Sequence, residues 1–347
     1  MKKFIFIFTL LSIASFASAQ TLRDITMQNI PVSIKAGVLT TDKDYQGAVS
    51  LLANSYDSEV IYTAGAALAA SPAPVYYTND LLSIAISANN DLKKIFAAVA
   101  LAAMDENNVE TIPLLESALE SGDVTIRGYA AAALALTNAQ TPGLNEYIFA
   151  LYPYDYIFAR RALRKLYAED KKLFVAAKKA ASSKTADARR GAAQVIGNLN
   201  NSGSAKVLLS MLKKEKEDNV QPAIAMALSK KAKEAVGTLE KCLSQAPQSS
   251  YAKGCALALG FMPDYSVSVI KNGLIDTNEK VRVNSARAAA AATMALSGVD
   301  ASYYSTDVPY ARQEIKTLIP QLLPVASGSG AGAPHAQKAL DEIKKLL

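Results

Sequence analysis

The chain has 347 residues, of which 50% are hydrophobic and 20% charged, and its formal net charge is +6. A chain this apolar is not expected to be disordered, and its length allows two compact domains or one elongated array. One histidine and two cysteines are too few for the common zinc sites, so we predict no metal and no cofactor.

Residues 1–19 have the composition of a secretory signal peptide. Lys2 and Lys3 precede an apolar run over residues 4–13, and residues 17–19 read Ala-Ser-Ala, a small-residue cleavage sequence. The apolar run is shorter than the roughly 20 residues that a membrane-spanning helix needs. We therefore expect cleavage before Gln20, export to the periplasm or beyond, and no integral membrane span. Export also excludes nucleic acid as a natural partner, despite the positive charge.

A block of small residues followed by a larger apolar residue recurs along the chain. The last residues of its copies are Leu68, Leu101, Leu134, Leu163, Ile196, Leu228, Leu259 and Ala289. Each copy follows an apolar segment with helical periodicity, such as Ile112, Leu115 and Leu119, so each repeat is predicted to be a pair of helices. Such a pair cannot bury its own apolar surface, and successive pairs are expected to stack into a solenoid.

Aspartates form a second ladder with nearly the same period, each a few residues before a small-residue block. Its members are Asp57, Asp91, Asp123, Asp155, Asp187, Asp218 and Asp276. An aspartate there can accept hydrogen bonds from the free N–H groups at a helix start. We predict that these residues cap the second helix of each pair; a row of cation-binding carboxylates is the alternative.

Several copies resemble the HEAT-repeat family. The resemblance rests on an aspartate, a base and paired alanines, clearest at Asp123 with Arg127, at Asp187 with Arg189, and at Arg282. It covers residues 44–297 and implies an all-α, right-handed α-solenoid of about eight to nine HEAT-like helical hairpins. At the position where the family pattern has a basic residue, four copies depart from it, with Ile61, Tyr156, Gln221 and Ala252.

The two ends of the array are irregular. Residues 20–43 contain Pro31 and form an N-terminal cap segment that is either helical or extended. Residues 298–310 are an insertion that breaks the period, and residues 311–347 are predicted to be a C-terminal capping helical pair. Its first helix is expected near residues 311–325, and the glycine-rich stretch 328–332 is interpreted as a linker, because it follows a helix and lacks a P-loop lysine.

The two cysteines, Cys242 and Cys255, are expected on the two helices of one hairpin. An oxidising compartment would allow a disulfide between them. Helix axes usually lie 8–10 Å apart, whereas a disulfide needs Cα atoms within about 7 Å, so the bond would be tight. Two small buried thiols are the alternative, and the sequence leaves both interpretations open.

Charge is unevenly distributed along the chain. Residues 21–159 are strongly acidic, whereas residues 160–233 are strongly basic and follow a cluster of aromatic residues. Tyrosine beside arginine is typical of binding hot spots, and a positive field attracts anions. The predicted partner-binding residues are Tyr152, Tyr154, Tyr156, Arg160, Arg161, Arg164, Lys165, Arg189 and Arg190. A solvated basic face beside core aromatics is the alternative.

These features predict a non-enzymatic binding or scaffold protein of the bacterial cell envelope or periplasm, whose partner is a protein or an anionic envelope component. No catalytic residues are predicted, because His335 is the single histidine and no nucleophile motif accompanies it. Two alternatives remain: a lyase- or hydrolase-like enzyme built on a HEAT-like array, and a self-associating structural protein.

Overall fold

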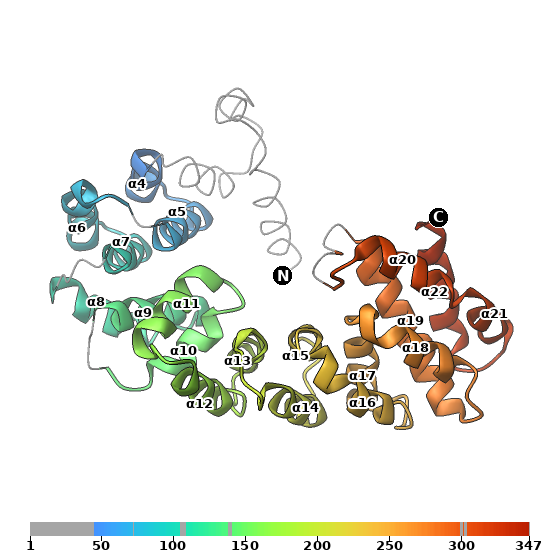
Figure 1. Ribbon diagram of the computed structural model, residues 1–347. Helices are drawn as coiled ribbons and strands as arrows, with labels where there is room; N and C mark the ends of the chain where they lie inside the picture. The colour runs from blue at the N-terminus through green and yellow to red at the C-terminus, as the bar shows by residue number, and fades with distance from the viewer. Residues whose placement is uncertain are drawn as a thin grey trace. The chain divides into compact units, whose positions relative to one another are not determined.

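The computed structural model describes residues 45–71, 73–104, 109–137, 141–298, 301 and 304–346 (Figure 1). These residues form helices and turns, and none of them belongs to a β-strand. The predicted all-α architecture is therefore confirmed. The predicted signal peptide and the N-terminal cap segment lie outside the described residues.

The chain divides into two compact units, Met1–Ala168 and Glu169–Leu347. The first unit contains four helical hairpins, in which each second helix packs on the next. Its helices are α4 (Tyr45–Asn54), α5 (Ser58–Ala70), η2 (Val75–Tyr77), α6 (Thr78–Ser87), α7 (Asp91–Ala103), η3 (Val109–Thr111), α8 (Ile112–Ala118), α9 (Val124–Leu136), α10 (Leu144–Leu151) and α11 (Tyr156–Leu166).

The second unit continues the hairpin pattern, with α13, α15, α17, α19 and α22 packed in succession. Its helices are α12 (Asp170–Ala180), α13 (Ala186–Asn198), α14 (Ser204–Lys214), α15 (Gln221–Ser229), α16 (Ala232–Cys242), α17 (Ser250–Gly260), α18 (Pro263–Leu274), α19 (Glu279–Ser297), α20 (Val308–Lys316), α21 (Ile319–Ser327) and α22 (Ala333–Lys344).

The recurring small-residue blocks form the buried faces of the second helices. In α7 and α9 the alanines of the block are almost completely shielded from solvent. Gly65 of α5 shows how close the helices come, because a Cβ atom there would overlap with the side chain of Phe96 on α7. Alanine and glycine are therefore used where neighbouring second helices need a close approach.

The aspartate ladder caps only some of the helices that it was predicted to cap. The prediction is confirmed at Asp57, Asp123 and Asp155. It is wrong at Asp91 and Asp276, because Asn90 and Asn278 supply the capping oxygens of α7 and α19. It is also wrong at Asp187 and Asp218, because α13 and α15 begin without a hydrogen bond from a capping side chain.

The C-terminal part differs from the predicted pair of helices. Helices α20 and α21 replace the single helix expected near residues 311–325, and the chain turns between them at Thr317 and Leu318. The described end of the preceding insertion is held against α18. Asp264 accepts hydrogen bonds from the Ser305 hydroxyl at 2.6 Å and the Thr306 backbone N–H at 3.0 Å.

Candidate functional site

The centre of the first unit is an aromatic cluster where α5, α7, α9 and α11 meet. Tyr62, Phe96 and Tyr129 contact one another and Tyr129 also contacts Phe158, with 5.1–5.8 Å between the centroids of the contacting rings. The Tyr129 hydroxyl donates to Asp155 Oδ2 at 2.8 Å, and Asp155 Oδ1 accepts from the Phe158 N–H at 2.9 Å. Burial raises the pKa of Asp155 and of both tyrosines. The hydrogen bonds link two repeats and cap α11, which makes this a structural centre.

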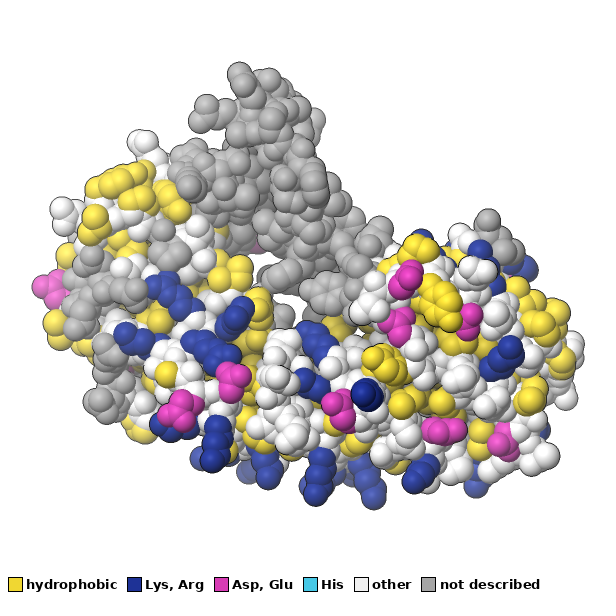
Figure 2. Space-filling model, in the orientation of Figure 1, with side chains coloured by type: hydrophobic (Ala, Val, Ile, Leu, Met, Phe, Trp, Pro, Cys, Tyr) yellow, Lys and Arg dark blue, Asp and Glu magenta, His cyan; other side chains and the backbone are white. Residues whose placement is uncertain are grey.

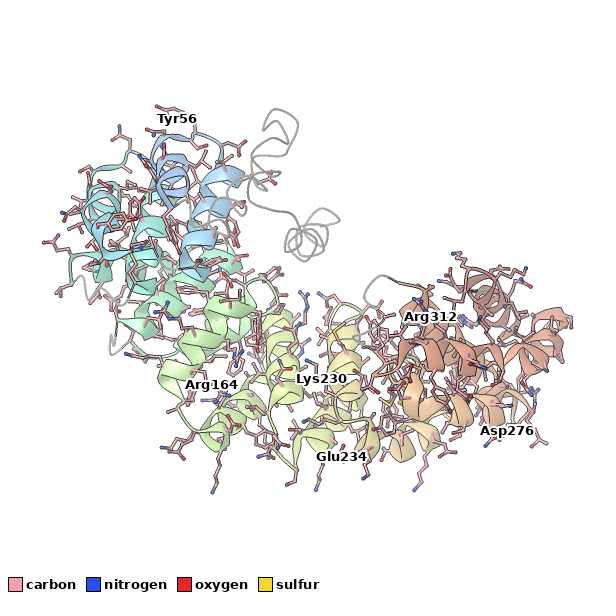
Figure 3. All side chains as sticks on the ribbon, turned by 45° about the horizontal axis from the view of Figure 1, so that its top comes forward. Tyr56, Arg164, Lys230, Glu234, Asp276 and Arg312 are labelled. Carbon is pink, nitrogen blue, oxygen red and sulfur yellow. A yellow bond between two sulfur atoms is a disulfide. The ribbon has the colours of Figure 1, made fainter. Side chains whose placement is uncertain are left out.

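Part of the predicted partner-binding group gathers at the start of α11. Tyr152 is buried and its ring packs edge-to-face on Tyr156, 5.3 Å between centroids. Arg160 Nη1 donates to the Tyr156 hydroxyl at 2.7 Å, with its guanidinium 5.7 Å from the Tyr156 ring centre. Arg164, labelled in Figure 3, lies one turn further along α11 and is half-buried. Tyr156 thus contacts two other predicted side chains, those of Tyr152 and Arg160.

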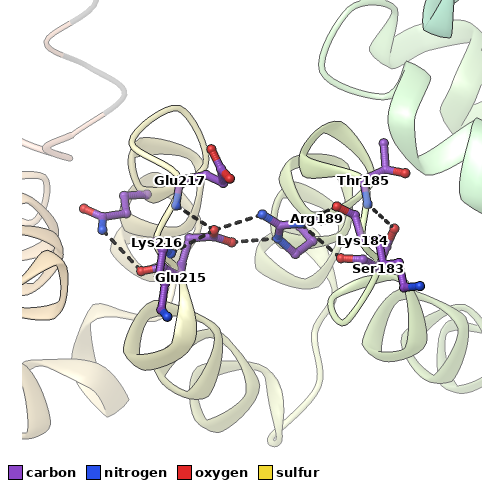
Figure 4. Close-up of polar contacts among 8 residues, drawn as sticks. Ser183, Lys184, Thr185, Arg189, Glu215, Lys216 and Glu217 are labelled. Atoms are coloured by element: carbon purple, nitrogen blue, oxygen red, sulfur yellow. Dashed lines mark hydrogen bonds and ion pairs between the residues drawn. The ribbon is translucent and has the colours of Figure 1, made fainter.

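Two of the five predicted arginines, Arg189 and Arg190, lie in the second unit and have protein partners. Arg189 forms a two-point ion pair with Glu215, from Nε to Oε2 at 2.8 Å and from Nη2 to Oε1 at 3.0 Å (Figure 4). Although burial opposes it, the Arg189 hydrogen bonds and the N–H groups of Glu217 and Lys216 hold the Glu215 pKa below its usual value. Arg190 pairs with Asp187 at 2.8 Å.

The predicted partner-binding residues are therefore divided between the two units. The ion pair of Arg189 with Glu215 joins α13 to the loop after α14. Much of the remaining positive charge has a local explanation. Figure 2 shows Lys and Arg side chains projecting along the edge where Figure 1 places α12, α14 and α16. Lysines in the last turns of these helices complement the helix dipole: Lys178, Lys179, Lys213, Lys214 and Lys241.

Three arginines that follow a helix start by a few residues share one structural role. Arg127, Arg189 and Arg282 each donate from Nη1 to the carbonyl of the residue six positions earlier, in the turn before their own helix. The rest of each guanidinium faces a different group. Arg127 lies over the Tyr147 ring, and Arg189 holds Glu215. Arg282 has no partner for Nε or Nη2 among the described residues and lines a cleft.

This cleft, which lies within the second unit, has a volume of about 490 Å³. It is bounded by the end of α18, the start of α19, α21 and the glycine-rich turn before α22. Its apolar lining comprises Leu274, Ile275, Val283, Pro320, Pro324, Val325 and Ala333. The turn at Asp276, labelled in Figure 3, lies beside it. The stretch interpreted as a linker, 328–332, thus forms one wall of the cleft.

Three polar side chains complete the lining of the cleft. Arg282 and Glu279 lie three residues apart in the first turn of α19, and they make no ion pair with each other. Gln321 on α21 has a buried side-chain oxygen without a hydrogen-bond partner. Buried polar groups normally have a partner, so this oxygen is an exception among the buried polar atoms of the described residues. The residues of this site come from three separate segments of the chain, so no local sequence pattern predicts it.

Cys242 of α16 and Cys255 of α17 form a disulfide, with a Cα–Cα distance of 6.3 Å. Both residues are buried. The two helices approach closely here because the residues around Cys255 are small, and the bond closes a loop over the turn that joins the helices.

Among the described residues, no helix is both long and apolar enough to cross a bilayer.

No family model matches the chain, and no curated protein matches it. Among solved structures, the chain is similar to human deoxyhypusine hydroxylase in complex with glycerol, with 14% sequence identity and a TM-score of 0.25. The similarity covers 89% of this chain and 99% of the hydroxylase chain.

The prediction of a non-enzymatic scaffold is corrected by this comparison, because the similar structure is that of an enzyme. The physical reason is that a helical-repeat fold does not determine function, which depends on the side chains of a particular site. The similarity is too low to transfer an activity or any site residue to this chain.

Proposed function

We propose that the protein binds a small, largely apolar ligand in the cleft between α18, α19, α21 and the turn 328–332. The observation that carries the proposal is the cleft itself. Its volume of about 490 Å³ lies within the range of ligand sites, and its lining is mostly apolar with a few polar groups. Such a cleft can hold the substrate of a reaction as well as a ligand that is only bound.

Nile red, an uncharged apolar dye whose emission rises in apolar surroundings, tests this proposal. We expect saturable binding of one dye per chain. Gly330→Phe should strongly reduce it, because a Cβ at Gly330 meets only Glu279 Oε1, at 3.8 Å, and the ring would occupy part of the cleft beside that residue. Gly237→Phe is the matched control, since Gly237 is exposed on α16 and has open space around it. Equal dye binding by both variants would refute the proposal.

We also propose that the chain is exported and loses residues 1–19. The signal-like composition supports export, and so does the disulfide, since such bonds persist in oxidising compartments. Mass spectrometry of the protein purified from its own cells tests this: the mature chain should begin at Gln20 and be two hydrogens lighter before reduction. An intact first residue would count against export with cleavage.

We further propose that the hairpins are HEAT repeats. The shared role of Arg127, Arg189 and Arg282, which each hold the turn before their own helix, supports this assignment beyond the spacing of small residues. Lysine lacks the planar fork that lets one guanidinium hold a turn and a second group together. Replacing each arginine by lysine should therefore lower stability at all three positions, most at Arg189, whose fork also holds Glu215, and least at Arg282, as measured by urea unfolding.

A further inference from the structure

Building on the proposed ligand cleft, we infer that its ligand is an amino acid or a short peptide. Such a ligand carries both an ammonium and a carboxylate group and has apolar side chains. Its carboxylate would bind the free edge of the Arg282 guanidinium, its ammonium would face Glu279, and its side chains would lie on the apolar lining. The inference concerns the chemical class of the ligand, and the existence of the cleft does not depend on it.

The protein itself shows how an arginine held in this manner binds a carboxylate. Arg189 and Arg282 are anchored alike, each by Nη1 to two carbonyls of the preceding turn. At Arg189 the opposite edge, Nε with Nη2, takes both oxygens of Glu215. At Arg282 the same edge has no acceptor among the described residues. A planar fork fixed in position is suited to two-point carboxylate recognition.

Glu279 determines which carboxylates would fit. It lines the same cleft three residues before Arg282, and none of the described residues forms an ion pair with it. A purely anionic ligand would be repelled by Glu279, whereas a ligand with an ammonium group near its carboxylate meets opposite charges at both positions. The position of Glu279 at the start of α19 is itself favourable for an acid, so the decisive group is Arg282.

The apolar lining determines the rest of the ligand. Leu274, Val283 and Val325 are buried or half-buried, and Pro320 and Pro324 add rigid apolar surface without N–H donors. The Gln321 side-chain amide, which lines the cleft, carries N–H donors for a peptide carbonyl. These features favour aliphatic side chains and a short peptide over a sugar or a nucleotide.

Competition against Nile red by three matched compounds tests the inference: the dipeptide Leu-Leu, its N-acetyl form and its C-terminal amide. Leu-Leu should displace the dye at the lowest concentration. The amide, which lacks the carboxylate, should need about ten- to hundredfold more, in keeping with the loss of a charge-assisted hydrogen bond. The N-acetyl form should lose less, because Glu279 is exposed to solvent.

Two variants assign these effects to residues. Arg282→Lys keeps a positive charge and donors for the turn carbonyls but removes the fork, so it should bring the competing concentrations of Leu-Leu and its amide close together. Glu279→Gln should bring Leu-Leu and its N-acetyl form to equal potency.

Equal competition by all three compounds on the wild-type protein would overturn the ligand class, and this readout does not require any variant to fold. If Gly330→Phe blocks the dye in that case, the cleft remains a binding site and only its assignment to dipolar ligands fails. If Gly330→Phe does not block the dye, the proposed function itself fails.

Discussion

Arg189 and Glu215 join successive hairpins of the second unit through parallel hydrogen bonds of 2.8 and 3.0 Å. Only 16% of the Arg189 side chain and 5% of the Glu215 side chain are exposed. Removing one partner leaves the other charged and largely desolvated. We therefore expect Glu215→Ala to lower the free energy of unfolding by about 3 kcal/mol. Urea titration measures this, with Glu234→Ala on the exposed face of α16 as the control; a similar loss in both variants would contradict the prediction.

The Glu215 carboxylate should also make the free energy of unfolding depend on pH. The Glu215 pKa is lower in the folded state than its ordinary value of 4.5, so the unfolded chain binds its proton first. The stabilisation is complete above pH 4.5 and is lost as pH falls through the folded value. Asp155, whose pKa is raised, acts in the opposite direction. The difference in unfolding free energy between wild type and Glu215→Gln should therefore shrink from pH 6 to pH 3; a constant difference would contradict this.

Tyr129→Phe should destabilise the first unit. The change removes the phenol that donates to Asp155 Oδ2 at 2.8 Å and leaves that oxygen buried without this donor. The expected cost is about 1–3 kcal/mol. Tyr156→Phe is the matched control, because its hydroxyl accepts from Arg160 at the exposed surface of α11. Chemical denaturation compares the two, and an equal effect would show that the buried hydrogen bond contributes nothing specific.

Gly65→Ala should cost about 1–3 kcal/mol, because the added methyl group must displace Phe96 from the aromatic cluster. Gly122→Ala, in the open turn before α9, has no atom within 4 Å of the new Cβ and should change stability little. The midpoint of thermal unfolding distinguishes them. A loss at Gly122 as large as that at Gly65 would argue against close packing of α5 on α7.

Reduction of the disulfide should lower stability by about 3 kcal/mol, because Cys242 and Cys255 are 13 residues apart and the bond restricts the unfolded chain. Urea unfolding with and without dithiothreitol measures the change. The double variant Cys242→Ala with Cys255→Ala should unfold at the lower urea midpoint, and dithiothreitol should not change that midpoint. Sensitivity of that variant to dithiothreitol would mean that the reductant acts elsewhere.

The period of small residues predicted the hairpins well, because every second helix meets its neighbours through the same face. The caps were less predictable, since asparagine replaces aspartate at Asn90 and Asn278, one residue before Asp91 and two after Asp276. The break between α20 and α21 was missed because Leu318 and Ile319 continue the apolar pattern through the turn.

The site was much harder to predict than the fold. A run of basic residues says nothing about which of them have internal partners, and Arg189 proved to be one that does. The cleft has no signature in sequence because Arg282 and Gln321 come together only when α19 and α21 pack. The glycines at 328–332 were the one local signal, and their role as a wall depends on helices on both sides.

In the first unit, α11 packs on α5 as well as on its sequence neighbours α9 and α10. In a simple solenoid each repeat contacts only the adjacent repeats, so unfolding can begin at one end and proceed repeat by repeat. Here the first and last hairpins share contacts and an aromatic centre, so deleting or opening either terminal hairpin exposes the middle of the unit. The four repeats should therefore melt together in one cooperative transition, with no stable shorter array.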